Sequence, residues 1–582
     1  MATSTPEAGA PLNGAATAPP EGYRRISSQP ENPFATLIPH QNIVVIPSFT
    51  LESGVTLRNV PVAYTTRGKL SPNRDNAMII CHALTGSADV ADWWGPLMGK
   101  GRAFDASRFF IVCLNSLGSP YGTASPVTNK DGDPSLGRYG PEFPLTTIRD
   151  DVNLHKLILD SLGVKQLAAV VGGSMGGMLV LEWAYFGKDY VRCIVPIATS
   201  SQHSAWGISW GEAQRQSIYC DPKYDDGYYP FEDPPTAGLG AARMSALLTY
   251  RSRNSFESRF GRNTPDPSRR QNINEQPRPP TPSNEHWAVH NEGHKNRRSP
   301  RQSSVSLSSD EHRAALASTT STPASTSSAS ASASAASIHT ASSTPTPVPT
   351  PGAAATTING TSDTSSSHPL TNFTDPQFSG ATTFTPPPPL STSNSSSSLS
   401  TNPRKRAATY FSAQSYLRYQ GDKFVKRFDS NCYIAITRKL DTHDVSRYRV
   451  DPSSPNPVGD ALALIQQPAL VIGIESDGLF TFAEQQELAA SIPKARLRTI
   501  DSPEGHDAFL LQFEQVNHHI LDFFGDVLPD IMTSAPIDPD YRDEDDVDDV
   551  DAEAATGEQS GVGKLKKSST FGEAEVDDIT SW

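Results

Sequence analysis

Residues 263–406 contain long runs of Ser, Thr, Pro and Ala, such as STTSTPASTSSASASASAAS, and almost no apolar clusters. A segment of this composition cannot bury enough apolar surface to offset the entropy lost on ordering. We therefore expect a long disordered insertion here. The 582-residue chain must build its core from the sequence on either side, residues 36–262 and 407–528, where apolar patterning is found.

The two ends of the chain differ in composition from these segments. Residues 1–35 are rich in Ala, Pro and Thr, and we expect a disordered lead. Residues 529–582 predict an acidic disordered tail, because positions 538–553 hold ten acidic residues against Arg542 alone. This run carries most of the formal charge of −14, so the remaining chain is nearly neutral and nucleic acid is not an expected partner.

The cysteines and the hydropathy indicate the compartment. The five cysteines are odd in number, have no CxxC spacing and lie mostly in apolar runs, which is typical of reduced core thiols. No apolar run approaches the roughly 18 residues that a membrane span needs. The N-terminus has neither the basic start nor the apolar stretch of a secretory signal. We expect a cytoplasmic protein without a membrane partner.

Short apolar runs alternate with helical patterns along the two segments. The runs predicted as strands buried on both faces are 77–81, 109–114, 167–171, 193–197 and 469–474. Thr147 and Asp150 have the spacing of a capping box, followed by helical periodicity that Gly163 closes. The alternation predicts an α/β protein with a mostly parallel sheet, whose chemistry lies at the carboxyl ends of the strands.

One such strand end carries a G-x-S-x-G motif. The run Val170–Val171 leads directly into Gly172-Gly173-Ser174-Met175-Gly176-Gly177, and MLVLEWAYF then reads as a helix. Small residues flank the serine because bulky ones would collide with the strand or the helix in so sharp a turn. The context predicts that Ser174 is a nucleophile.

A serine hydroxyl needs a base, and the base needs a carboxylate to orient it. In the α/β-hydrolase fold these residues follow in the order Ser, Asp or Glu, His. Asp477 lies just after the strand PALVIGI, and His506 lies after the next strand-like stretch, ARLRTI, just before an apolar helix. We expect Asp477 and His506 to complete a triad with Ser174.

Four other residues are competitors for these two roles. The carboxylates Glu475 and Asp507 could reach the imidazole, and the histidines His82 and His203 could act as base. His82 precedes the nucleophile and His203 follows it too closely, so chain order disfavours both.

The oxyanion of the reaction also needs donors. The strand AMIIC ends in the loop HALTG, which should supply one backbone N–H, and the residue after the nucleophile should supply another. Leu84 and Met175 are the candidates.

Longer stretches resemble one family, the homoserine O-acetyltransferases, and particularly their fungal members. They are HALTGSADV, WWGPLMG, NSLGSPYGTASP, GGSMGGM, AWGISWGEAQRQSI, ARMSALLTYRS, SDGLF and GHDAFL. The resemblance covers nearly all of residues 36–262 and 410–525. It implies an α/β-hydrolase fold with a helical lid, and the insertion falls in that lid.

The resemblance also implies the reaction. Acetyl-CoA would acetylate the serine, and the serine would pass the acetyl group to L-homoserine, giving O-acetyl-L-homoserine for methionine biosynthesis. Acetyl-CoA is then a co-substrate, with no further cofactor and no metal; a homodimer is left open. Arg243 matches the residue that holds the amino-acid carboxylate, Asp507 the one that holds its amine, and Tyr250 is a weaker candidate.

The triad alone does not distinguish this reaction from related ones. The alternatives are an O-acyltransferase that acts on L-serine or a deacetylated β-lactam intermediate, one that uses succinyl-CoA, and a serine hydrolase of the same fold. A closed, narrow pocket would favour transfer over hydrolysis.

Overall fold

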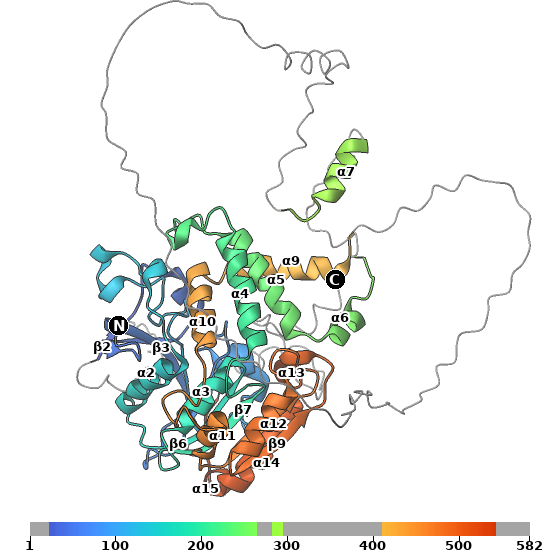
Figure 1. The fold of residues 1–582 in the computed structure, drawn as a ribbon. Helices are drawn as coiled ribbons and strands as arrows, with labels where there is room; N and C mark the ends of the chain where they lie inside the picture. The colour runs from blue at the N-terminus through green and yellow to red at the C-terminus, as the bar shows by residue number, and fades with distance from the viewer. Residues whose placement is uncertain (1–22, 265–281, 295–409, 543–582) are drawn as a thin grey trace, which may run out of the picture. The chain divides into compact units, whose positions relative to one another are not determined.

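The structure is a computed structural model, and it describes residues 23–264, 282–294 and 410–542. A nine-stranded sheet forms the centre of the fold, in the order β1-β2-β3-β5-β4-β6-β7-β8-β9 (Figure 1). The strands are β1 (Arg24–Ile26), β2 (Asn42–Thr50), β3 (Thr56–Arg67), β4 (Ala77–Cys81), β5 (Phe110–Leu114), β6 (Leu167–Gly173), β7 (Val191–Ile197), β8 (Ala469–Ile474) and β9 (Ala495–Ile500).

The larger part of the sheet is parallel, as predicted. Strands β5, β4, β6, β7, β8 and β9 pair in parallel, and the five predicted runs form β4 to β8. Every residue of β4, β6 and β8 is buried, which explains why these strands lack polar alternation. The carboxyl ends of β4, β6 and β8 therefore meet at one edge of the sheet, where the predicted site residues follow them.

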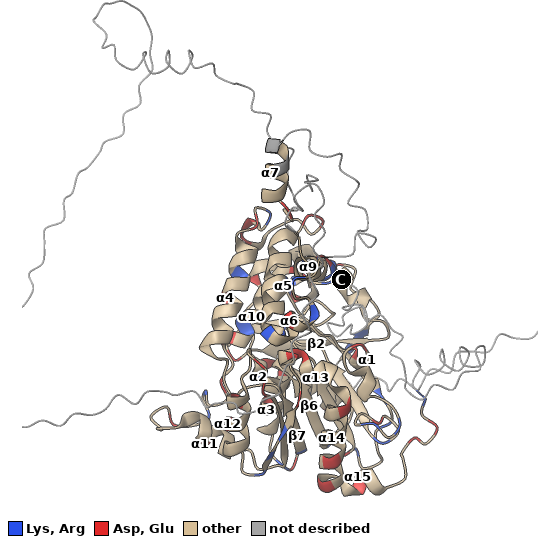
Figure 2. Ribbon diagram, turned by 90° about the vertical axis from the view of Figure 1, so that its right-hand side faces the viewer, with Lys and Arg blue, Asp and Glu red and all other residues tan. Residues whose placement is uncertain are grey.

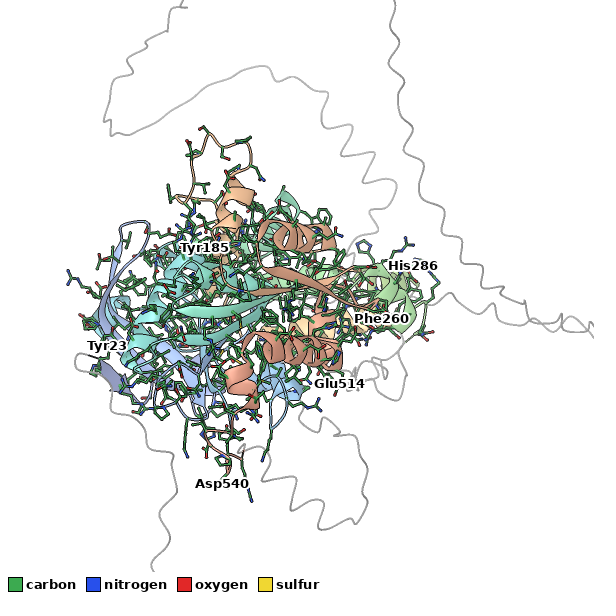
Figure 3. All side chains as sticks on the ribbon, turned by 90° about the horizontal axis from the view of Figure 1, so that it is seen from below. Tyr23, Tyr185, Phe260, His286, Glu514 and Asp540 are labelled. Carbon is green, nitrogen blue, oxygen red and sulfur yellow. The ribbon has the colours of Figure 1, made fainter. Side chains whose placement is uncertain are left out.

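Helices cover both faces of the sheet, and side chains fill the space between (Figure 3). One face packs against α2 (Ile148–Ser161), α3 (Met175–Ala184) and α12 (Phe482–Ser491), and the other against α1 (Val90–Trp94) and α14 (Phe513–Val527). Helix α2 begins with the predicted capping box, in which Asp150 N donates to Thr147 Oγ1 and Thr147 N to Asp150 Oδ2. These layers bury the strands between them.

The lid is built from helices inserted between β7 and β8. Helix α4 packs on α5 and α10, and α5 packs on α9 (Figure 1). The lid helices are α4 (Ala205–Tyr219), α5 (Thr236–Tyr250), α6 (Arg253–Arg259), α9 (Ser412–Phe424) and α10 (Ser430–Asp441). In Figure 2, blue segments on α4, α6 and α10 show where the lid carries Lys and Arg. Red segments on α14 and on α15 (Pro529–Thr533), away from the lid, show Asp and Glu.

The expected insertion is anchored at both ends in this lid. Ser412 N donates to the carbonyl of Asn263 at 2.8 Å, so the chain leaves and re-enters the lid at neighbouring points. Within the expected insertion, residues 282–294 contain helix α7 (Pro282–His290), and Glu292 pairs with Arg418 of α9 at 2.6 Å. The expectation of an insertion without structure therefore does not hold for this stretch; residues 265–281 and 295–409 lie outside the described ones.

The N-terminal expectation is also corrected. The expected lead of residues 1–35 includes β1, which pairs with β2; β1, β2 and β3 are the antiparallel strands at this edge of the sheet. Gln29 Nε2 donates to Gly122 O and Asn32 Nδ2 to Pro120 O, each at 2.8 Å. Polar side chains make these attachments, so apolar patterning does not reveal them. Residues 1–22 lie outside the described part.

The start of the expected tail is likewise attached. Residues 529–533 form α15. The Asp538 carboxylate forms an ion pair with Lys69 at 3.0 Å, and the Asp538 amide donates to Ser107 O. Residues 543–582 are not among those described. The described residues also form two short α-helices, α11 (Pro457–Ala463) and α13 (Ala508–Leu511). Of the helices in the described ranges, none is both long and apolar enough to cross a membrane.

Candidate active site

Ser174 sits at the turn between β6 and α3, in a backbone conformation with φ 59° and ψ −126° that side-chain-bearing residues rarely adopt. The turn is tight because the strand and the helix touch. A Cβ on Gly176 would lie 2.2 Å from Cys81 O, and one on Gly172 would lie 2.6 Å from Gly176 O. Only glycines fit, and the turn lifts the Ser174 side chain above the carboxyl end of β6.

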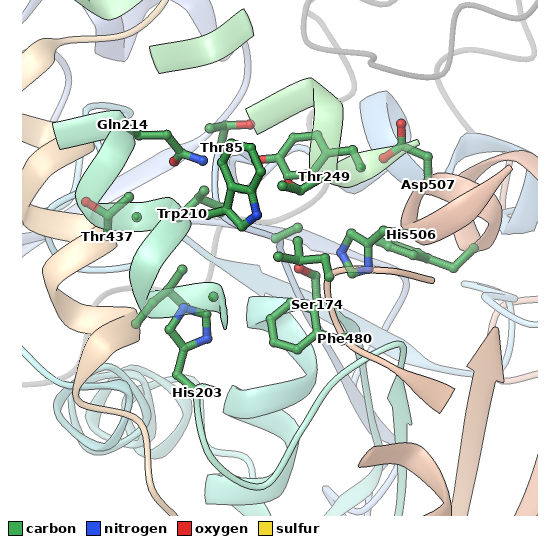
Figure 4. A pocket seen from close by; sticks show the side chains of 18 of the residues that line it. Thr85, Ser174, His203, Trp210, Gln214, Thr249, Thr437, Phe480, His506 and Asp507 are labelled. Carbon is green, nitrogen blue, oxygen red and sulfur yellow. The ribbon is translucent and has the colours of Figure 1, made fainter. Parts of the chain in front are cut away.

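His506 lies on a 3-10 turn (Gly505–Asp507) that precedes α13, with its ring next to Ser174 (Figure 4). Its Nδ1 is 2.7 Å from Asp477 Oδ2. The other oxygen of Asp477 accepts the amides of Leu479 at 2.8 Å and Phe480 at 3.0 Å. A carboxylate accepts, so Nδ1 carries the proton and donates, which leaves Nε2 as the ring's acceptor.

The structure separates Asp477 from its competitors. Glu475 is exposed on the loop after β8. Asp507 Oδ2 lies 2.9 Å from Nε of Arg251, so this carboxylate is engaged elsewhere. Asp477 Oδ2 lies within hydrogen-bond distance of His506 Nδ1, and this contact identifies Asp477 as the orienting carboxylate.

The competing histidines are placed differently. His82, the first residue of the HALTG loop, is buried; its Nε2 accepts the amide of Ser116 at 3.0 Å and its Nδ1 donates to Ala83 O at 2.8 Å. Burial lowers the pKa of His82 to about 4, so the ring is neutral near pH 7. His203 does line the pocket, and burial lowers its pKa to about 4 as well. Neither ring hydrogen-bonds to a carboxylate within the described part of the chain.

The HALTG loop is shaped so that a backbone N–H can face the pocket. The carbonyl of Ala83 accepts both Gly86 N, at 3.0 Å, and His82 Nδ1. Because a trans peptide directs its C=O and N–H to opposite sides, the amide of Leu84 points away from these two donors. Met175 is the first residue of α3, where backbone amides have no partner inside the helix. The oxyanion role of Leu84 and Met175 stays a prediction.

The pocket that joins these groups lies beneath the lid and has a volume of about 60 Å³. Its lining is mainly apolar and aromatic, with side chains from the core loops, α4, α5, α10 and α13. They include Leu84, Trp93, Tyr250, Leu440 and Phe509. Figure 4 labels others of them, Ser174, His203, Trp210, Gln214, Thr249, Phe480, His506 and Asp507. The described residues contain no group of three or more His, Cys, Asp and Glu side chains arranged to hold a metal ion.

The three predicted substrate residues are not all placed alike. Asp507 and Tyr250 line the pocket, and the Tyr250 ring centroid is 6.2 Å from that of His506. Arg243 is buried on α5 and is not on the pocket wall; its guanidinium lies 5.4 Å from the Tyr250 ring and 4.8 Å from the Phe424 ring. Arg243 thus contacts the pocket through Tyr250, two helical turns away on the same face.

Sequence reasoning missed Arg251. It is buried beside the catalytic loop and pairs with both Asp507 and Glu504. A lone arginine at a helix end normally indicates a solvated charge, and only its place in the TYRS stretch, next to Tyr250, could have drawn attention to it.

Comparisons with known proteins agree with this architecture. A family described as the alpha/beta hydrolase fold matches residues 76–350. A homoserine O-acetyltransferase of Emericella nidulans is 63% identical, over 97% of this chain and 99% of the relative. One from Schizosaccharomyces pombe is 53% identical, over 95% and 96%. The crystal structure of a homoserine O-acetyltransferase from Bacillus anthracis has a TM-score of 0.54 at 16% identity, covers 83% of this chain and 96% of its own, and shows the same fold. The expected α/β-hydrolase fold is confirmed.

Proposed function

The chain belongs to the homoserine O-acetyltransferase family, and from that premise we propose that it transfers the acetyl group of acetyl-CoA to the hydroxyl of L-homoserine through an acyl-Ser174 intermediate. The products are O-acetyl-L-homoserine and CoA, and the reaction belongs to cytoplasmic methionine biosynthesis. The observation that carries the proposal is the 2.7 Å contact of His506 with Asp477 beside Ser174, in a pocket beneath the lid.

In the first half-reaction, His506 Nε2 takes the proton of Ser174 Oγ as the oxygen attacks the thioester carbonyl. The amides of Leu84 and Met175 stabilise the negative oxygen that forms. The C–S bond then breaks, and CoA leaves as a thiol with the proton from His506. Asp477 keeps Nδ1 protonated throughout and stabilises the transient imidazolium.

In the second half-reaction, the hydroxyl of homoserine occupies the place of the departed thiol. His506 takes its proton, the hydroxyl oxygen attacks the acyl carbon, and Ser174 regains its proton when the ester is released. Asp507 is next to His506 in the chain and lines the pocket, so it can pair with the ammonium of the acceptor. Arg243 holds the carboxylate in this proposal, with Tyr250 moving aside or relaying the contact.

The pocket supports transfer over hydrolysis. Its mainly apolar and aromatic walls offer few polar partners to water around an acyl-serine, and a positioned acceptor hydroxyl then competes well. Lid residues of α4 and α5 form part of these walls, which connects the preference to the lid helices.

The test uses the purified full chain with acetyl-CoA and follows CoA release with homoserine, with L-serine or with water alone as acceptor. Homoserine should give by far the fastest release, double-reciprocal plots should be parallel, and Ser174→Ala should abolish turnover. Equal release with water alone would identify a hydrolase. Faster CoA release with serine, or with succinyl-CoA as donor, would identify one of the related transferases. Intersecting double-reciprocal plots would contradict the acyl-enzyme intermediate.

A further inference from the structure

Arg251 joins the lid to the loop that carries His506. It follows Tyr250 at the end of α5 and directly precedes the N-cap of α6, and its side chain is only 3% exposed. The guanidinium uses two of its nitrogens on two different carboxylates. NH1 lies 2.8 Å from Glu504 Oε2, and Nε lies 2.9 Å from Asp507 Oδ2. Burial alone would lower the pKa of Arg251, but Asp507 and Glu504 raise it, so the charge is retained.

Glu504 anchors this contact on the lid side. Besides Arg251 it accepts Ser255 Oγ at 2.5 Å and pairs with Arg259 NH2 at 2.9 Å, and both partners lie on α6. The backbone takes part as well, since Ser252 N donates to Glu504 O at 3.3 Å. Two arginines therefore balance two carboxylates, and Arg251 is the one that contacts both.

The fit of the loop against Arg251 is close. Gly505 has φ +78°, and a Cβ there would lie 2.8 Å from the carbonyl carbon of Arg251 and 2.4 Å from Ser252 N. The residues on either side of His506 are thus both held by the α5–α6 junction, Gly505 through this packing and Asp507 through the ion pair. NH1 donates a hydrogen bond to Glu504, whereas the contact of Nε with Asp507 is an ion pair. The delocalised charge of one guanidinium can reach both carboxylates at once, whereas a lysine ammonium is a point charge.

We propose that Arg251 is a positioning residue for the amino-acid acceptor: its ion pair with Oδ2 holds the Asp507 side chain at the pocket wall, where the carboxylate can meet the acceptor's ammonium. The proposal rests on the proposed function and specifies how that function selects its substrate. The selection for an amino acid over a plain hydroxy acid then depends on a residue outside the pocket lining.

A comparison of two acceptors measures the contribution of the ammonium group to catalysis. Homoserine and 4-hydroxybutanoate differ by the amino group, so the ratio of their kcat/KM values measures how much the enzyme gains from it. If Arg251 acts through Asp507, Arg251→Gln should lower this ratio by about tenfold or more, the usual effect of losing one charge-assisted contact. The ratio is the readout because a shift of the loop that carries His506 would slow both acceptors alike, whereas loss of the ammonium contact slows homoserine alone.

Arg259→Gln is the matched control. It removes the other positive charge of the same cluster and contacts Glu504 but not Asp507, so the ratio should not change. Arg251→Lys serves as the second variant if Arg251→Gln does not fold. It keeps the charge and loses the guanidinium, and it should also lower the ratio.

Failure of the proposed function and failure of the inference about Arg251 give different results. If the wild type does not use homoserine, the proposed function fails. If the wild type does use homoserine and the variants lose both acceptors in equal proportion, Arg251 has only a structural role and the inference is overturned. A ratio that rises in Arg251→Gln would also overturn it, since Arg251 would then merely compete with the ammonium for Asp507.

Discussion

Replacing Asp477 by Asn would reverse the polarity of one buried contact while leaving its shape intact. In the native protein, Oδ1 of Asp477 accepts two backbone amides and Oδ2 accepts His506 Nδ1. An asparagine would keep its carbonyl oxygen on the two amides, which need an acceptor, and would turn its NH₂ group towards His506. The imidazole must then present a lone pair at Nδ1, and its proton moves to Nε2.

The consequence for catalysis follows from this tautomer. With Nε2 protonated, His506 cannot accept the proton of Ser174, so acylation loses its base. An Asp to Asn change with the same consequence in serine proteases lowers kcat on the order of 10⁴-fold, equivalent to about 5.5 kcal/mol in the barrier. We expect a loss of this size for Asp477→Asn. The thermal midpoint should change little, because the side chain keeps its volume and its number of hydrogen bonds.

Rapid-mixing measurement of CoA release from acetyl-CoA gives the acylation rate directly. Glu475→Gln is the control, because this exposed carboxylate two residues away should not affect the rate. The reasoning would be refuted if the acylation rate of Asp477→Asn stayed within tenfold of wild type and that of Glu475→Gln were also unchanged. Neither carboxylate would then be the group that orients His506. Loss of activity in Glu475→Gln alone would mean that Glu475, and not Asp477, orients His506.

Two further predictions concern the lid. Arg243→Gln should weaken acceptor kcat/KM by about tenfold to a hundredfold while the CoA burst without acceptor persists; disappearance of the burst would mean that Arg243 supports the donor or the fold instead. Replacing residues 296–408 by a short Gly/Ser linker should leave turnover and the calorimetric midpoint near their wild-type values, because Asn263 and Ser412 are hydrogen-bonded and the excised composition is poor in apolar residues. A drop of many degrees would show that the excised residues pack on the folded part.

Local sequence determined much of this protein because the features in question are local. The glycines around Ser174 respond to clashes within one turn, Thr147 and Asp150 cap their own helix, and the buried strands show their environment in their composition. That Ser174, Asp477 and His506 meet could be predicted because each follows a strand, and parallel strands bring their carboxyl ends to one edge. Each of these inferences needs only a few neighbouring residues, or the fact that parallel strands end at the same edge of a sheet.

Tertiary structure alone decided which charges meet. Arg251 and Glu504 are 253 positions apart, and the buried pair of Lys439 and Asp151, at 2.5 Å, joins the lid to the core across 288 positions. Nothing in the neighbouring sequence of an arginine or a lysine specifies a distant partner. The same holds for Arg243, which lies behind Tyr250 because the packing of α5 on α9 puts Phe424 against it. Periodicity and turn chemistry act over a few residues, whereas the pairing of buried charges depends on how the lid packs on the sheet.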